Sequence, residues 1–266
     1  MLTHKYKLGV IGLGNHFFKN NYPNLYKNNL FEICGAFSTS KKNKYKYYKG
    51  IKIYSTINSI LKERDINYFY VSNISSLHFK TCLKLLKNKK NIICEKPLTL
   101  NEKDFIKLVN VAKKNNVVIF EAFMFKYHKN FLKLKTIINQ NKKNIKSIDI
   151  KFNIPELKRN NFRYNKKKGG GAFLDLGCYT VKMLSLIIGS YKEVDKIYGF
   201  KLYDKKKVDL SGNAIILLKN NIICNLEWGF NKFYQNSINI NTSRKFIKAN
   251  KIFSKKTSEK TKIEIQ

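Results

Sequence analysis

The chain has 266 residues, which is enough to bury a full core and to form one large domain or two smaller ones. Its formal net charge is +36, yet 49 of its 53 basic residues are lysine, whereas arginine is the residue that grips phosphates and guanine edges bidentately. The composition therefore predicts a lysine-rich solvated surface and no specific nucleic-acid partner. The first residues show no apolar stretch long enough for a signal peptide or membrane span, so we expect no membrane association.

The first half of the sequence, from Tyr6 to Phe120, alternates short apolar runs with amphipathic ones. This pattern is typical of repeated strand-helix-strand units around a parallel sheet. We expect strands near 6–11, 31–37, 51–54, 67–72, 91–94 and 117–121. Helices are expected near 16–28, 56–63, 76–88 and 102–115, with Ser75 or Ser76 and Asn101 as N-caps.

After Glu121 the pattern changes. It predicts a helix near 129–140, a strand near 145–153, and a helix near 172–188 that ends at Gly189. Longer alternating segments follow near 193–203, 210–219 and 222–230, the last two joined by a tight turn at Asn220-Asn221. We therefore predict an α/β protein with an N-terminal doubly wound Rossmann domain (1–121). The rest (122–266) is predicted to be an α/β domain with helices on one face of an open, largely antiparallel sheet.

The cysteines are five, widely spaced, and contain no C-x-x-C pair. This spacing indicates free thiols in a reducing compartment, so we expect a cytoplasmic protein. We predict no metal site.

A glycine turn, Gly12-Leu13-Gly14, lies between the first predicted strand and helix. Glycine at such a turn lets the backbone meet a pyrophosphate held at the helix N-terminus, so Gly12, Gly14 and Asn15 are candidate cofactor contacts. The third position of the usual fingerprint is the bulky Phe17, and the alternative is an ordinary tight turn.

The second predicted strand ends in Ser38-Thr39-Ser40-Lys41, without the acid that binds the ribose hydroxyls of NAD. Hydroxyl and ammonium groups suit a 2′-phosphate instead. Ser38, Ser40 and Lys41 therefore predict a preference for NADP(H) over NAD(H).

Two further segments contain candidate catalytic residues. Glu95-Lys96-Pro97 ends the fifth predicted strand, and a triple glycine, 169–171, precedes Asp175 and Tyr179. These last two residues share a helix face at i and i+4. The alternative is a purely structural role for both residues. Asp175 would then be an acidic residue that the helix dipole favours near the helix start, and Tyr179 would be a packed tyrosine.

In this order the three segments resemble the Gfo/Idh/MocA family of nicotinamide-dependent oxidoreductases. The resemblance implies a catalytic Lys96, with Tyr179 as general acid and base and Asp175 on a substrate hydroxyl. The resemblance also implies that Glu95 shapes the turn, and we include Glu95 among the candidate cofactor contacts.

Four other positions match the family less specifically. Asn73 and His78 follow the fourth strand and are candidate cofactor contacts, although a lone histidine is more often structural. Arg163 and Tyr127 are candidate substrate contacts, and Tyr127 could equally anchor the joint between the domains.

The resulting hypothesis is an NADP(H)-dependent oxidoreductase that transfers a hydride to or from a carbonyl or hydroxyl carbon of a sugar or nucleotide sugar. Activity on trans-dihydrodiols and a weakly catalytic cofactor-binding role are the alternatives. The resemblance also implies a homodimer or homotetramer formed through the open sheet face, and a second domain shortened at its C-terminus, because family members usually extend beyond residue 266.

Overall fold

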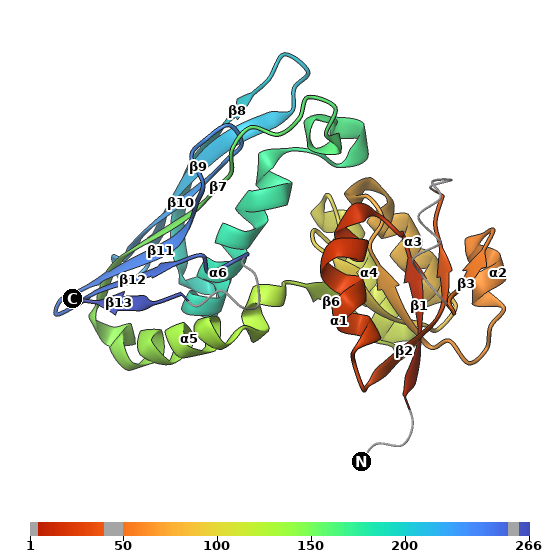
Figure 1. Cartoon of the computed structure of the whole chain (residues 1–266). Coiled ribbons are helices and arrows are strands. Elements are labelled where there is room, and N and C mark those ends of the chain that lie inside the picture. The colour runs from red at the N-terminus through yellow and green to blue at the C-terminus, as the bar shows by residue number, and fades with distance from the viewer. Residues whose placement is uncertain (1–4, 40–49, 255–260) are drawn as a thin grey trace. The chain divides into compact units, whose positions relative to one another are not determined.

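The computed structural model describes residues 5–39, 50–254 and 261–266. The chain divides into two compact units, Met1–Ala122 and Phe123–Gln266. Each is described by itself (Figure 1). The division falls one residue after the boundary expected from the sequence.

The first unit contains a six-stranded sheet in which every strand pair is parallel. Its strand order is β3-β2-β1-β4-β5-β6, which is the doubly wound Rossmann order. This confirms the predicted fold of the first half and all six of its predicted strands. The strands are β1 (Tyr6–Ile11), β2 (Phe31–Phe37), β3 (Lys52–Tyr54), β4 (Tyr68–Val71), β5 (Asn91–Glu95) and β6 (Ile119–Ala122).

The helices of this unit are α1 (Tyr22–Tyr26), α2 (Ile57–Leu61), α3 (Ser75–Lys87) and α4 (Glu102–Lys114). Asn101 caps α4 as predicted, because its side chain accepts from the Asp104 N–H. The predicted cap of α3 is wrong: Ile74 occupies that position, and both serines lie inside the helix. The predicted first helix contains a π turn, η1 (Phe17–Asn21), directly before α1.

The second unit contains a seven-stranded sheet in the order β13-β12-β11-β7-β10-β9-β8. All pairs are antiparallel except β7 with β10, which confirms the largely antiparallel sheet. The last three strands were not predicted. The strands are β7 (Ile145–Asn153), β8 (Val194–Tyr203), β9 (Asp209–Leu218), β10 (Ile223–Gly229), β11 (Gln235–Thr242), β12 (Phe246–Asn250) and β13 (Ile263–Ile265).

The main helices of the second unit are α5 (Lys129–Asn141) and α6 (Cys178–Ile188), and a π turn, η7 (Phe173–Gly177), leads into α6. Short turns η3 (Met124–Tyr127) and η5 (Phe162–Tyr164) precede α5 and η7. One helical run, 166–188, is long and apolar enough to cross a membrane by length and composition. Core helices pass the same test, and Met183 and Leu184 of this run are buried in the hydrophobic core of the unit.

The two faces of this sheet differ in chemistry. Ile148, Ile150 and Phe152 of β7 are buried in the core, on the face that α6 covers (Figure 1). The residues between them point to the other face, because side chains alternate along a strand. On that face a hollow of about 520 Å³ is lined by polar and charged side chains, among them Lys151 and Asn239, and by none of the predicted site residues.

Candidate functional site

The glycine turn after β1 is tight and leads directly into a helix. Gly12 has φ +98°, and a Cβ there would meet the backbone nitrogen of Asn73 at 2.5 Å, so no other residue fits without a shift. At Gly14 nothing lies within 4 Å of the position a Cβ would occupy. The loop therefore leaves open space directly before the helix that starts at Asn15. Backbone N–H groups at such a helix start attract phosphate oxygens.

Asn73 lies against this loop, after β4. Its Nδ2 donates to Thr81 Oγ1 at 3.0 Å, whereas its Oδ1 is buried without a hydrogen-bond partner among the described residues. Buried acceptors are normally satisfied. The predicted contact of Asn73 with a cofactor stays a prediction.

His78 connects two loops of the site. The residue is 1% exposed, with Nδ1 2.7 Å from the Pro97 carbonyl oxygen and Nε2 3.0 Å from that of Asn73. Burial lowers the pKa of His78, so the neutral ring donates to one of these two carbonyls at a time. His78 thereby ties the loop after β4 to the turn after Lys96. Its predicted contact with a cofactor stays a prediction.

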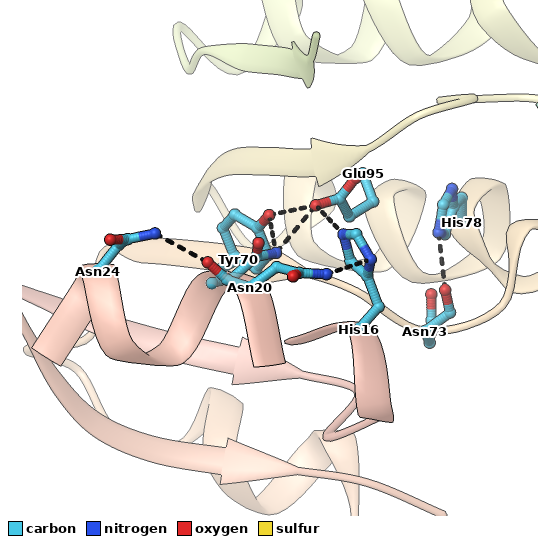
Figure 2. A network of polar contacts seen from close by, with 8 residues as sticks. His16, Asn20, Asn24, Tyr70, Asn73, His78 and Glu95 are labelled. Atoms are coloured by element: carbon cyan, nitrogen blue, oxygen red, sulfur yellow. Dashed lines mark hydrogen bonds and ion pairs between the residues drawn. The ribbon is translucent and has the colours of Figure 1, made fainter. Parts of the chain in front are cut away.

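A buried polar network stands at the carboxyl end of β5 (Figure 2). Oε1 of Glu95 accepts from the Tyr70 hydroxyl at 2.5 Å and from Asn21 Nδ2 at 2.9 Å. The same amide nitrogen lies 2.5 Å from the Tyr70 oxygen. His16 Nε2 is 3.5 Å from Glu95 Oε1, and its Nδ1 is 3.1 Å from Asn20 Nδ2.

The network holds Glu95 as a carboxylate. Burial by itself would raise the pKa of Glu95, but contacts from His16, Tyr70 and Asn21 outweigh it and lower that pKa. Burial and the neighbouring carboxylate raise the pKa of Tyr70, which therefore stays a phenol and a donor. Sequence reasoning did not foresee Tyr70, Asn21 or His16, because only folding brings them to Glu95.

Lys96 follows Glu95 directly and is half-buried at the same edge of the sheet. The turn after it is fixed from the next strand, because Glu121 Oε1 accepts from the Leu98 N–H at 2.9 Å. Lys96 thus extends from a braced strand end near the glycine loop, since the carboxyl ends of parallel strands meet at one edge. Of the residues predicted to select NADP(H), Ser38 follows β2, while Ser40 and Lys41 lie outside the described residues.

In the second unit, Asp175 is paired with the predicted substrate residue Arg163. The Arg163 Nε donates to Asp175 Oδ2 at 2.5 Å, and the guanidinium stacks over the ring of Phe162 at 4.9 Å. Both side chains are partly buried, with 31% and 16% of their surface exposed. The structure thus brings together two residues that were predicted separately.

The last residue of the triple glycine, Gly171, has no room for a side chain. Gly171 has φ +123°, and a Cβ there would collide with the carboxylate of Asp209. That carboxylate accepts from the Phe173 N–H at 2.6 Å and caps the first turn of the helix that carries Asp175. Asp209 lies 34 residues after Asp175 in the chain, so the sequence gives no local signal for this cap.

Tyr179 lies in an aromatic cluster of the second unit. Four phenylalanine rings surround it with centroids 5.3–6.0 Å away, two of them edge to face and two tilted. They are Phe123, Phe125, Phe152 and Phe253. The half-buried Tyr179 ring is thus held in a fixed, apolar setting. Tyr127 is 63% exposed, with the Lys126 ammonium 5.7 Å from its ring, and its role stays a prediction.

No group of three or more His, Cys, Asp or Glu side chains in the described part of the chain could hold a metal ion. The described cysteines form no disulfide bond.

Comparison with known proteins gives consistent matches. Residues 6–123 match the model of the oxidoreductase family GFO_IDH_MocA, NAD-binding Rossmann fold, and residues 131–248 match the GFO/IDH/MocA C-terminal domain. A trans-1,2-dihydrobenzene-1,2-diol dehydrogenase of Xenopus laevis is 33% identical over 53% of this chain and 43% of its own length. The chain thus spans less than half of this relative.

A dTDP-3,4-didehydro-2,6-dideoxy-alpha-D-glucose 3-reductase of Actinomadura kijaniata is 24% identical over 93% of this chain and 75% of its own length. Among solved structures, a 3-ketoreductase from Actinomadura kijaniata in complex with NADP and TDP-benzene superimposes with a TM-score of 0.92 at 22% identity. That match covers 99% of this chain and 82% of the other. The two family domains, in this order, establish that the chain belongs to the Gfo/Idh/MocA family of oxidoreductases.

Proposed function

We propose that this protein is an NADP(H)-dependent oxidoreductase that reversibly converts a carbonyl carbon of a sugar-like substrate to a carbinol. The observation that carries the proposal is the carboxyl edge of the first sheet. The open glycine loop at Gly12 and Gly14 follows β1 there, and the braced Lys96 follows β5, with β4 between these two parallel strands. The backbone of the loop, Ser38 and Asn73 would hold the dinucleotide. When bound, the reduced nicotinamide supplies the hydride.

In this mechanism Tyr179 is the general acid of carbonyl reduction. Its hydroxyl gives a proton to the carbonyl oxygen as the carbon accepts the hydride, and takes the proton back in the reverse direction. The Lys96 ammonium hydrogen-bonds the same oxygen and stabilises the phenolate that Tyr179 becomes. A carbonyl, a hydride and a proton thus give an alcohol, and the phenolate is reprotonated from solvent.

Asp175 and Arg163 position the substrate. The bond from Arg163 Nε orients the Asp175 carboxylate toward a substrate hydroxyl, and the rest of the guanidinium suits an anionic or hydroxylated group of the same molecule. Loss of this pair is expected to raise KM more than it lowers kcat, because it removes binding and leaves the proton donor in place.

The preference for NADP(H) is part of the proposal. It rests on the hydroxyl of Ser38, the absence of an acid at the end of β2, and a similar fold solved with NADP. The test is the ratio of dissociation constants for NADPH and NADH, measured by fluorescence titration. Tighter binding of NADH would contradict this part.

The relatives favour two substrate classes. The 3-reductase matched over most of the chain favours a nucleotide-linked keto sugar, and the dihydrodiol dehydrogenase favours a trans-dihydrodiol. A screen that follows NADPH oxidation with keto sugars and NADP+ reduction with dihydrodiols separates them. Binding of the cofactor with no turnover of either class would favour a cofactor-binding protein with little catalysis.

We further propose a homo-oligomer in a reducing compartment such as the cytoplasm. Large apolar side chains on β8, such as Tyr198 and Phe200, are 63% and 60% exposed, and exposed apolar surface of this kind commonly marks an interface. Light scattering coupled to size exclusion tests the oligomer.

The catalytic roles are tested by two substitutions, Lys96→Ala and Tyr179→Phe. Each is expected to lower turnover by about a hundredfold or more, the usual range for lost acid-base help, with little change in NADPH affinity. Tyr191→Phe, in a side chain that is 81% exposed, is the matched control and should leave turnover unchanged. Full activity in Tyr179→Phe would reject the assigned proton donor.

A further inference from the structure

The open face of the second sheet carries a hollow whose shape follows from the strand register. Ser237 on β11 lies directly opposite Lys151 on β7 and opposite Asn250 on β12. Side chains that are directly opposite in an antiparallel pair point to the same face of the sheet. The short side chain of Ser237 therefore lies between two longer ones, and the surface is recessed along this row. All three residues line the hollow of about 520 Å³.

A second row brings another lysine to the hollow. Lys248 on β12 lies opposite Asn239 on β11, and both residues line the hollow. Strand β11 lies between β7 and β12, and neighbouring strands are about 4.8 Å apart, so Lys151 and Lys248 start from strands about 10 Å apart. Lysine carries its charge on a long, flexible stem. Two ammonium groups can therefore approach one ligand from opposite walls of the hollow.

The lining of the hollow is basic and otherwise consists of neutral hydrogen-bonding groups. Three of the nine described lining residues are lysines, the third being Lys251, and none of the nine is acidic. The other six carry amide or hydroxyl groups, which can donate hydrogen bonds as ammonium groups do. Asp149, opposite Asn239 on the same face, accepts from Asn225 Nδ2 at 2.7 Å and is not part of the lining. The hollow thus offers donors and positive charge to an anionic ligand.

Two acids outside the lining pair with its lysines. Lys151 Nζ lies 3.2 Å from Glu227 Oε2, and Lys248 Nζ lies 4.0 Å from Glu264 Oε2. An ammonium has three N–H donors, so one carboxylate does not use all of them. Burial by itself would raise the pKa of Glu227, but the surrounding hydrogen bonds, led by that from Lys232, lower it to about 2. This low pKa indicates a positive potential beside the hollow.

We propose that this hollow binds a small multivalent anion, a diphosphate or a molecule that bears one, through Lys151 and Lys248. Two walls with one ammonium each suit two neighbouring charged groups, and lysine binds phosphate as a point charge without the planar fork of arginine. None of the proposed catalytic residues is among the described residues that line the hollow. The exposed apolar side chains of β8 lie toward the opposite edge of the sheet. The inference therefore stands without the proposed function.

A specific site differs from the general attraction of a basic chain in two measurable ways. A net charge of +36 attracts any multivalent anion. At about 0.15 M salt, however, exposed charges more than about 8 Å apart are largely screened, whereas contacts inside a hollow are screened less. A site also saturates with one ligand per chain and depends on particular lysines, whereas general attraction depends on none of them.

The experiment is isothermal titration calorimetry of the full chain with inorganic pyrophosphate at about 0.15 M salt. Lys248→Gln removes one charge from the hollow, and its matched control is Lys146→Gln, at an exposed lysine of β7 outside the lining. Ser237→Phe fills the floor of the hollow without changing the charge. Its matched control is Asn241→Phe, at an exposed position farther along β11 that is also outside the lining.

The wild type and both controls should bind one pyrophosphate per chain. Lys248→Gln and Ser237→Phe should each weaken binding by about tenfold or more, as expected when a charge-assisted hydrogen bond or the space for the ligand is lost. The Lys248 side chain is 41% exposed, so Lys248→Gln should leave folding unaffected and remains decisive if Ser237→Phe unfolds the unit. Absence of saturable binding by the wild type, or equal weakening in Lys248→Gln and Lys146→Gln, would overturn the inference.

A second titration with ADP distinguishes two sources of the diphosphate group. Binding of ADP that Lys248→Gln weakens as it weakens pyrophosphate binding would identify nucleoside diphosphates as ligands of the hollow. Binding of ADP that this variant leaves unchanged would restrict the hollow to the free diphosphate. Binding and oxidation of NADPH are measured separately, so failure of the inference leaves the proposed oxidoreductase activity intact.

Discussion

Replacing Tyr70 by phenylalanine tests the buried network beneath Lys96. The substitution removes one oxygen, and with it the 2.5 Å hydrogen bond to a Glu95 side chain that is only 11% exposed. A hydrogen bond to a charged group contributes about 1.5–3 kcal/mol to stability. Asn21 still donates to Glu95 but loses its second acceptor. We therefore expect Tyr70→Phe to lower the free energy of unfolding by about 2–3 kcal/mol at pH 7.

The pH dependence of this loss has a defined sign. The pKa of Glu95 is lowered in the folded chain, so its ionised form contributes stability above the ordinary carboxyl pKa of about 4.3, and that contribution is lost as the pH falls through the folded value. A protonated Glu95 gains less from the Tyr70 hydroxyl. The difference between wild type and Tyr70→Phe should consequently be smaller at pH 4 than at pH 7.

Urea unfolding followed by far-ultraviolet circular dichroism measures the loss. Trp228 is the only tryptophan of the chain and belongs to the second unit, so its fluorescence reports that unit separately. Tyr68→Phe, two residues earlier on the same strand, is the matched control and should change the stability by less than about 0.5 kcal/mol. Equal losses in the two variants, or none in Tyr70→Phe, would refute the reasoning.

Two further predictions concern the second unit. Gly171→Ala should destabilise it more than Gly189→Ala, because both positions have positive φ but only at Gly171 would the added methyl meet the Asp209 carboxylate; equal shifts in the Trp228 unfolding midpoint would contradict this. The Glu227 carboxylate accepts a hydrogen bond from Lys232 at 2.8 Å. Burial alone would raise the pKa of Glu227, but hydrogen bonds from Lys232, Asn153 and Lys151 outweigh it and lower that pKa to about 2. Its contribution to stability should therefore be present above about pH 4.3 and fall away toward pH 2, and Glu227→Gln should flatten that part of the stability profile.

Much of the fold could be predicted because it depends on local patterns. The apolar runs of the first unit gave the six parallel strands, and the turn at Asn220-Asn221 joins β9 to β10 with a positive φ of 62° at Asn221. The strands β11 to β13 were missed although Ile238 and Ile240 alternate with asparagines, a period of two. Asparagine is depleted in strands, and its abundance here concealed that signal.

Candidate site residues could be proposed from the sequence only where they stand in a contiguous motif. Lys96 and the pair of Asp175 with Tyr179 stand in short motifs, and the resemblance assigned them roles. Asp209 could not be found, because its capping bond to the start of the Asp175 helix joins distant parts of the chain. The π turn at Phe17–Asn21 could not be predicted either, because a helical hydrophobic pattern does not distinguish five residues of π turn from α-helix.

The central claim is that Lys96 and Tyr179 act on one substrate oxygen beside the nicotinamide. A crystal structure of the chain with NADP+ tests it most directly. The account predicts that the Lys96 ammonium and the Tyr179 hydroxyl both face the nicotinamide ring, close enough to hydrogen-bond the same atom. Density that places either group away from the ring, with the cofactor bound at the glycine loop, would contradict it.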